Sequence, residues 1–410
     1  MTVRNVRLVK VAEPASSPFD AEPSLADDLR ERVGRVAEIA ARHADDVDRA
    51  ARFPGEAIAA AKAEGLMSVM APVALGGEAA RIADVADVCY ALGRACASTA
   101  MVYAMHQVKV ACIVRHSDDS PWHQDFIRRL AREQLLIASS TTEGQGGGNV
   151  RSSEAPILRD GGRVALERAA SVISYGAEAD ALATTARRAP DAAAADQVLA
   201  VFLRADYGLE RTLSWDTLGM RGTCSAGFTL RAGGDAAQVV PTPYAAIHAQ
   251  SMVPSAHILW SSAWAGVAAA AVENARRYLR KAARDSAGAL PPSAPYYTRA
   301  NASLRALRAL IATTTERYEA LGADSEALMG VDFQSEISLL KVDASELAVA
   351  AVMGALRCCG LSGYRNDSDI SIGRHLRDVL SSPIMINNDR ILANVAASAL
   401  LTETPAGVRG

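Results

Sequence analysis

The hydrophobic pattern changes its period twice along the chain and so divides it into three regions. From Ser24 to residue 135, apolar residues recur every three or four positions, as at Leu25, Leu29 and Val33, which predicts amphipathic helices. Between 136 and 240, short β-like runs alternate with turns. From 241 to 402 the helical period returns in segments long enough to cross a bundle.

These regions predict an α+β protein with an N-terminal α-helical domain, a middle β-barrel or β-sheet domain and a C-terminal four-helix bundle. Residues 1–23 are expected to be an extension and 403–410 a tail. The clearest predicted helices cover 82–97, 99–113, 122–132, 255–285, 297–321, 332–359 and 374–401. The predicted strands cover 135–139, 163–167, 171–174, 198–203 and 227–230.

Composition narrows the class of protein. The 410 residues are half apolar and carry a formal net charge of −3, with basic residues dispersed among acidic ones, so nucleic acid is not an expected partner. No apolar run reaches the length of a membrane span, and residues 1–23 are not expected to act as a signal peptide because they lack an uninterrupted apolar segment. Six cysteines without disulfide spacing favour a reducing compartment, and we expect a cytoplasmic protein. The histidines lack metal-ligand spacing, and no metal site is predicted.

A Gly-rich segment runs from Glu143 to Asn149. It lacks the third glycine of the dinucleotide fingerprint and the Lys-Ser/Thr of the phosphate loop. Taken alone, it is more often a plain flexible loop than a phosphate cradle.

Several segments together resemble the acyl-CoA dehydrogenase family. They are Ser-Ser-Thr-Thr-Glu-Gly at 139–144, Pro-Val-Ala-Leu-Gly-Gly at 72–77, Trp-Asp-Thr-Leu-Gly-Met-Arg-Gly-Thr at 215–223, and Arg-His-Leu-Arg-Asp at 374–378. Each match is weak, but they follow the family's order over roughly residues 25–400. The resemblance implies a homodimer or homotetramer that binds FAD and desaturates an acyl thioester of CoA or a carrier protein. The β-hydrogen would leave as hydride to flavin N5, and an electron-transfer partner would reoxidise the flavin.

The resemblance also assigns positions to the cofactor. Thr141 and Thr142 would lie beside the pyrimidine end of the flavin, and Arg357 would reach FAD from a neighbouring subunit. Val172 replaces the tryptophan of the family's Trp-Ile-Thr strand. The full set of cofactor positions is Thr141, Thr142, Gly147, Gly148, Val172, Ser174, Arg357, Asn387 and Asn388.

The family's catalytic carboxylate is missing at both of its known places. Ile386 stands where the family's Tyr-Glu-Gly-Thr carries glutamate, and Ala256 stands where some members carry the base on the first bundle helix. The nearest titratable replacements are Asp389 and His257. Asp389 is otherwise read as a helix-capping or ion-paired carboxylate, and His257 as a packed helix histidine.

Two reactions therefore stay open. The first is α,β-desaturation with a displaced base. The alternative is a flavin-dependent monooxygenase on the same fold, which uses reduced flavin and oxygen and needs no α-proton base. A scaffold without activity is a third reading.

Overall fold

The computed structural model describes residues 27–117, 119–143 and 152–400. Its first part is helical because apolar residues at helical spacing form buried faces, as Leu29, Val33 and Val36 do on the first helix. Almost every residue of α4 is buried, which makes it the central helix of this part. The helices are α1 (Asp27–Ala50), α2 (Gly55–Ala63), η1 (Leu66–Ser68), η2 (Val73–Leu75), α3 (Ile82–Ala95), α4 (Ala97–Arg115) and α5 (Pro121–Glu133).

The middle part holds two sheets. The first has the order β1-β4-β5, with β1 parallel to β4 and β4 antiparallel to β5, and consists of β1 (Ile137–Ser140), β4 (Ala181–Arg187) and β5 (Gln197–Leu203). The second is antiparallel, has the order β2-β3-β7-β6, and consists of β2 (Leu158–Asp160), β3 (Arg163–Ile173), β6 (Tyr207–Leu213) and β7 (Ala226–Asp235). Short 3-10 segments flank the strands: η3 (Arg204–Asp206), η4 (Arg221–Thr223) and η5 (Ala236–Gln238).

Both neighbours of β7 carry an irregularity at the same end of the second sheet. The pairing of β3 with β7 shifts between Ala170 and Ile173, and that of β6 with β7 shifts between Arg211 and Leu213. Such bulges bend a strand and take residues out of the ladder. The backbone at Ser171 is therefore free of ladder pairing at this sheet end.

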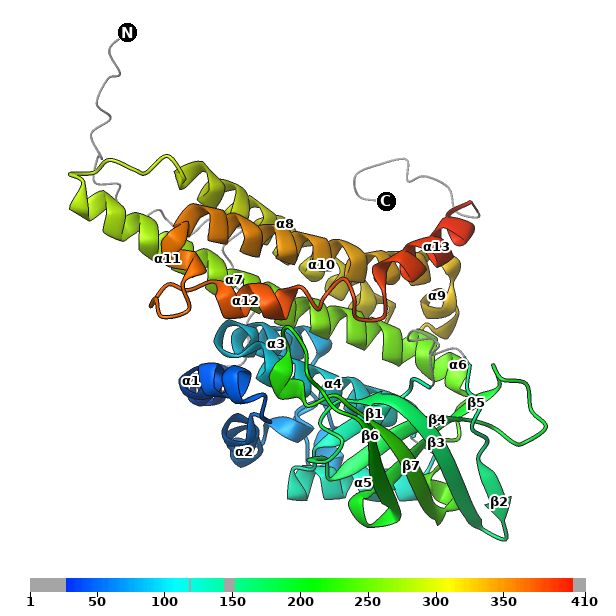
Figure 1. Ribbon diagram of the computed structural model, residues 1–410. Coiled ribbons are helices and arrows are strands. Elements are labelled where there is room, and N and C mark those ends of the chain that lie inside the picture. Colours follow the sequence, from blue (N-terminus) through cyan, green and yellow to red (C-terminus); the bar gives the residue numbers. More distant parts are fainter. Residues whose placement is uncertain (1–26, 118, 144–151, 401–410) are drawn as a thin grey trace.

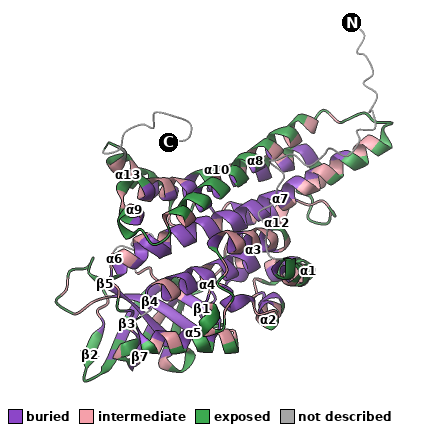
Figure 2. Cartoon of the chain, turned by 180° about the vertical axis from the view of Figure 1, so that it is seen from behind, coloured by how far each residue is buried: buried purple, intermediate pink, exposed green. Residues whose placement is uncertain are grey.

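The last part is a helical bundle built on one long helix. α7 lies between the layer of α8 and α10 and the N-terminal helices, and it is buried along most of its length (Figures 1 and 2). Its close approach to α3 needs glycine, because a Cβ on Gly93 or Gly266 would overlap the other helix's backbone. The elements are α6 (Tyr244–Ile247), the π-helical η6 (His248–Met252), α7 (Val253–Asp285), α8 (Ala294–Leu321), α9 (Ser325–Met329), α10 (Val331–Cys359), α11 (Leu361–Tyr364), α12 (Gly373–Val379) and α13 (Asn388–Ala399).

The predicted fold class is confirmed: helical first and last parts enclose a middle part of sheets. The predicted helix over 374–401 is wrong as a single element, because it breaks between α12 and α13 around Pro383. A proline cannot donate the helical hydrogen bond at that point. The domain limits at 24, 136, 241 and 403 stay predictions, and the extension and tail lie outside the described residues.

No helix in the described part of the chain combines the length and apolar character that crossing a membrane requires.

Candidate active site

Two predicted site residues meet the bulged end of the second sheet. The backbone of Glu143 bridges that of Ala170 on β3, which brings Thr142 beside the bulge. The Ser171 hydroxyl donates to the Thr142 hydroxyl at 3.5 Å. Thr141 and Thr142 are half-buried. The chain after β1 therefore presents hydroxyl groups next to unpaired backbone.

Ser174, which follows β3, belongs to a series of hydroxyl groups. The Ser225 hydroxyl donates to that of Ser174 at 2.8 Å and lies 2.7 Å from that of Thr223. The Thr223 hydroxyl donates to the carbonyl of Met220, and the Met220 amide donates to Asp378 Oδ1 at 2.7 Å. This path joins the sheet end to α12.

Ion pairs hold α12 against α1. Arg374 pairs with Asp45 at 2.9 Å, and Arg377 donates to Asp48 at 3.0 Å. Burial raises the pKa of Asp378, which lies between them, to about 6. These groups bind one another, so they act as structural clamps rather than as a reaction centre.

The same sheet end also exposes apolar side chains. Val172 is 37% exposed and Leu213 is 61% exposed. A Cβ on Gly227 would come within about 3 Å of both Leu213 and the Ser171 carbonyl, so these groups flank one glycine. Hydroxyl groups beside an exposed apolar surface suit a planar ring with polar edges, as a flavin has. The described residues therefore fit the predicted cofactor.

The turn before α13 has strained backbone at the position of the missing glutamate. Ile386 has φ +49° and Asn387 has φ +60°, both in the left-handed region. A β-branched residue there is a genuine outlier, and such strain gathers at functional sites. The Asn387 side chain accepts from the Asp389 amide at 3.0 Å and caps α13.

A buried lysine, which the sequence did not single out, anchors this turn. Lys341 on α10 donates to Asn388 Oδ1 at 2.6 Å, and its ammonium lies 5.8 Å from the centre of the Trp264 ring. Burial lowers the pKa of Lys341 to about 8, and Glu346 acts in the opposite direction. In the sequence, the feature that could have indicated this buried lysine is that it is the single charged residue in the stretch Ile337–Val342.

One candidate base is hydrogen-bonded in the core, and the other lies at the surface. His257 is buried, and its Nδ1 lies 2.7 Å from the carbonyl of Ile337. Burial lowers the pKa of His257 to about 4, so it is neutral near pH 7. Asp389 is exposed in the first turn of α13. The structure thus places both in the roles of a packed histidine and a helix-end carboxylate.

Arg357 does not join the other predicted residues within one chain. It lies sixteen residues after Lys341 on α10, which corresponds to about 24 Å along the helix. Its guanidinium stacks on Tyr296, 4.1 Å from the ring centre, and donates to the Tyr296 hydroxyl at 2.7 Å. Gly147 and Gly148 lie outside the described residues.

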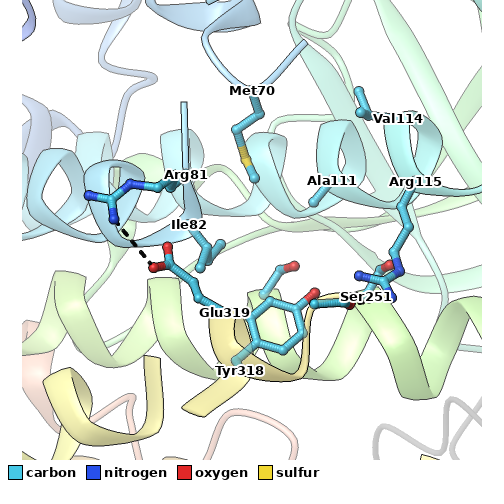
Figure 3. A pocket seen from close by; sticks show the side chains of 11 residues that line it. Met70, Arg81, Ile82, Ala111, Val114, Arg115, Ser251, Tyr318 and Glu319 are labelled. Carbon is cyan, nitrogen blue, oxygen red and sulfur yellow. Dashed lines mark hydrogen bonds and ion pairs between the residues drawn. The ribbon is translucent and has the colours of Figure 1, made fainter. Parts of the chain in front are cut away.

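A cavity of about 380 Å³ opens between α3, α4, α7 and α8 (Figure 3). Arg81 and Glu319 face each other on one side of it, and Arg115 lies on the other. Its inner wall includes Ser251 and Tyr318. None of the predicted site residues lines this cavity. Within the described residues, no group of His, Cys, Asp and Glu could hold a metal ion.

Comparison with known proteins agrees with this architecture. The family model for the acyl-CoA dehydrogenase N-terminal domain matches residues 25–148, and that for the C-terminal domain matches 249–401. A cyclohex-1-ene-1-carbonyl-CoA dehydrogenase of Geobacter metallireducens is 24% identical over 370 residues, which cover 89% of this chain and 94% of that protein. A probable acyl-CoA dehydrogenase of Mycobacterium leprae is 29% identical over 141 residues, 34% of this chain and 36% of the relative.

Solved structures share the whole fold. KijD3, determined in complex with dTDP, has a TM-score of 0.81 at 21% identity and covers 95% of this chain and 100% of its own. FMN-bound TdsC from Paenibacillus sp. has a TM-score of 0.80 at 19% identity, covering 92% and 98%. A nitrososynthase from Micromonospora carbonacea var. africana has a TM-score of 0.78 at 22% identity, covering 93% and 99%. With both family models matched in order, this chain belongs to the acyl-CoA dehydrogenase family and is a flavoprotein oxidoreductase.

Proposed function

We propose that this chain is a flavin-dependent monooxygenase that inserts oxygen into a small molecule. The observation that carries the proposal is the chemistry at the two places where family members hold their base. Ile386 and Ala256 cannot accept a proton, His257 is bonded to a backbone carbonyl, and Asp389 is exposed in the first turn of α13. A desaturase must remove an α-proton, whereas oxygenation by reduced flavin does not.

Different residues of the chain would contact the polar edge and the face of the flavin. Thr142, Ser171 and Ser174 would hold the polar edge of the flavin by hydrogen bonds, and Val172 would support the ring face. A bound, reduced flavin would supply the electrons that activate molecular oxygen. Ile386 and Ala256 would keep the reacting region apolar, which excludes water and suppresses side reactions.

Desaturation of an acyl thioester is the second candidate. Support for it comes from the relative in Geobacter, named as a CoA-thioester dehydrogenase, which matches nearly the full length of the chain. This reaction would need a base that the turn before α13 does not supply in its present conformation.

One anaerobic experiment separates the two. Oxidised flavin is bound to the purified protein and titrated with a panel of acyl-CoAs, and the visible flavin absorbance is followed. We expect no bleaching by any thioester, together with tighter binding of chemically reduced flavin than of oxidised flavin, both measured without oxygen. Bleaching would establish the dehydrogenase instead. The variant Ile386→Glu is the positive control, because it restores a carboxylate at the family's position.

The identity of the flavin is open to a direct competition. The resemblance predicts FAD with a contribution from Arg357 of a second subunit, but Arg357 is stacked on and hydrogen-bonded to Tyr296. We therefore expect FMN to bind about as tightly as FAD. A dissociation constant for FAD at least tenfold lower would restore the prediction of FAD held across an interface.

A further inference from the structure

A second buried lysine lies in the centre of the N-terminal helices without an anionic partner. Lys109 on α4 is only 3% exposed. Its ammonium contacts Met252 Sδ at 2.8 Å, and a thioether is a weak acceptor. No carboxylate pairs with Lys109 among the described residues, and the thiol of Cys112, which also contacts Met252 Sδ, is neutral near pH 7 because burial raises its pKa to about 12.

The cost of this arrangement is large. A buried ammonium without a counter-ion loses several kcal/mol of hydration. Burial lowers the pKa of Lys109 to about 8, so the group still carries its charge near pH 7. The other buried cation of this region, Arg168, differs because Glu143 lies 3.3 Å from it. Lys109 is thus the buried cation that the chain leaves uncompensated here.

A further buried polar group lies in the same region. The Tyr244 hydroxyl is buried and has no hydrogen-bond partner in the described structure. Tyr244 lies near enough to Cys112 and Arg168 for both to act on its pKa, which burial raises. Lys109 and Tyr244 can both donate a hydrogen bond, which is what an anion requires.

Lys109 is linked to the cavity region through its contact Met252 and to β1 through a neighbour on its own helix. Met252, its contact, follows Ser251, and Ser251 and Ser255 line the cavity of Figure 3. Methionine has three rotatable bonds and can move aside. On the same face of α4, one turn earlier, His106 accepts a hydrogen bond from the amide of Ile137 on β1. Lys109 itself does not line the cavity, whose α4 wall is formed by Ala111, Val114 and Arg115, but its contact Met252 is the chain neighbour of a wall residue.

We propose that Lys109 binds a carboxylate of the substrate, so that the molecule oxidised is a small organic acid or an acyl group with a free carboxylate. The role of this acid as substrate rests on the proposed function, whereas the binding of a carboxylate at Lys109 is independent of it.

The test compares acids with their neutral amides on the full-length protein. Thermal unfolding and calorimetric titration are measured with butyrate, succinate and glutarate, and with butyramide and glutaramide. We expect at least one acid to raise the melting temperature and its amide to leave it unchanged. Lys109→Met should raise the dissociation constant of that acid at least tenfold, while the ligand-free variant unfolds at the same or a higher temperature. Lys109→Arg should retain measurable binding.

Lys341→Met is the matched control, because it removes another buried ammonium. It should weaken flavin binding and leave acid binding intact, and Lys109→Met should do the reverse. The proposal is overturned if no acid binds, which would mean that internal water satisfies these groups. It is also overturned if Lys109→Met loses stability and leaves acid binding unchanged. Acid binding without flavin binding would refute the proposed function alone.

Discussion

His257 and Asp389 illustrate how one residue's partners decide its chemistry. His257 Nδ1 is hydrogen-bonded to the carbonyl of Ile337, and Asp389 is exposed to solvent at the start of a helix. Loss of a true general base costs about 10²–10⁴ in rate. We expect His257→Gln and Asp389→Asn to change kcat by less than about threefold. A hundredfold loss in either variant, with an unchanged fold by circular dichroism, would identify the missing base.

Lys341 offers a second prediction at this scale. Its bond to Asn388 is charge-assisted, and such bonds contribute about 1.5–3 kcal/mol, while relief of its buried charge offsets part of that loss. We expect Lys341→Met to leave global stability nearly unchanged but to speed hydrogen exchange in the turn 383–388 and weaken flavin binding. Lys341→Arg should retain more of the flavin affinity. Equal exchange rates in both variants and wild type would show that Asn388 does not depend on this lysine.

The turn between α12 and α13 stores backbone strain at Ile386. A left-handed conformation costs an ordinary residue roughly 1–2 kcal/mol, and asparagine tolerates it better. We expect Ile386→Asn to stabilise the protein by about 1 kcal/mol in denaturant unfolding. Ile384→Asn is the control, because Ile384 is 76% exposed and is not among the positive-φ residues. A loss of stability in Ile386→Asn would mean that apolar contacts of Ile386 outweigh its strain.

The elements show which parts of the fold a sequence reveals. Long helices such as α7 and α10 were predicted because their apolar faces repeat over many turns. β4 escaped prediction because Ala-Leu-Ala-Thr-Thr-Ala-Arg is a buried central strand without alternation. The break before α13 was not predicted, although Pro383 within the segment cannot donate a helical hydrogen bond.

The sequence could bring together only part of the candidate site. Thr142 and Ser174 lie at the same sheet end, and their contact with a flavin stays a prediction. Lys341 and Lys109 could not be assigned, because their meaning depends on which side chains pack around them. A single lysine in an apolar helix is compatible with many arrangements. Only the three-dimensional contacts distinguish a lysine that holds a turn, such as Lys341, from one without an anionic partner, such as Lys109.

The whole molecule should be sensitive to mild acid. Burial lowers the pKa of five histidines to about 3–4: His106, His116, His123, His257 and His375. In the unfolded chain histidine titrates near 6.5, so the unfolded state binds more protons below that pH and stability is lost as pH falls from about 6.5 to 4. Asp378 acts in the opposite direction, because its pKa is raised to about 6 and its neutral form favours folding.

We therefore expect the free energy of unfolding to fall steeply between pH 6.5 and 4 in urea titrations. Unfolding at pH 5 should take up several protons, which calorimetry in buffers of different ionisation enthalpy can count. His106→Gln should reduce that uptake by about one. A flat stability profile over this range would contradict the burial of these side chains.

The clamp between α12 and α1 has a consequence for synthesis of the chain. Asp45 and Asp48 emerge from the ribosome early, but their partners Arg374 and Arg377 follow 329 residues later. At about 5–20 residues per second, that delay is on the order of 15–65 s. During this interval the exposed face of α1 is without its final partner. The nascent helical domain therefore folds without this clamp, and we expect truncation before α12 to lower its stability.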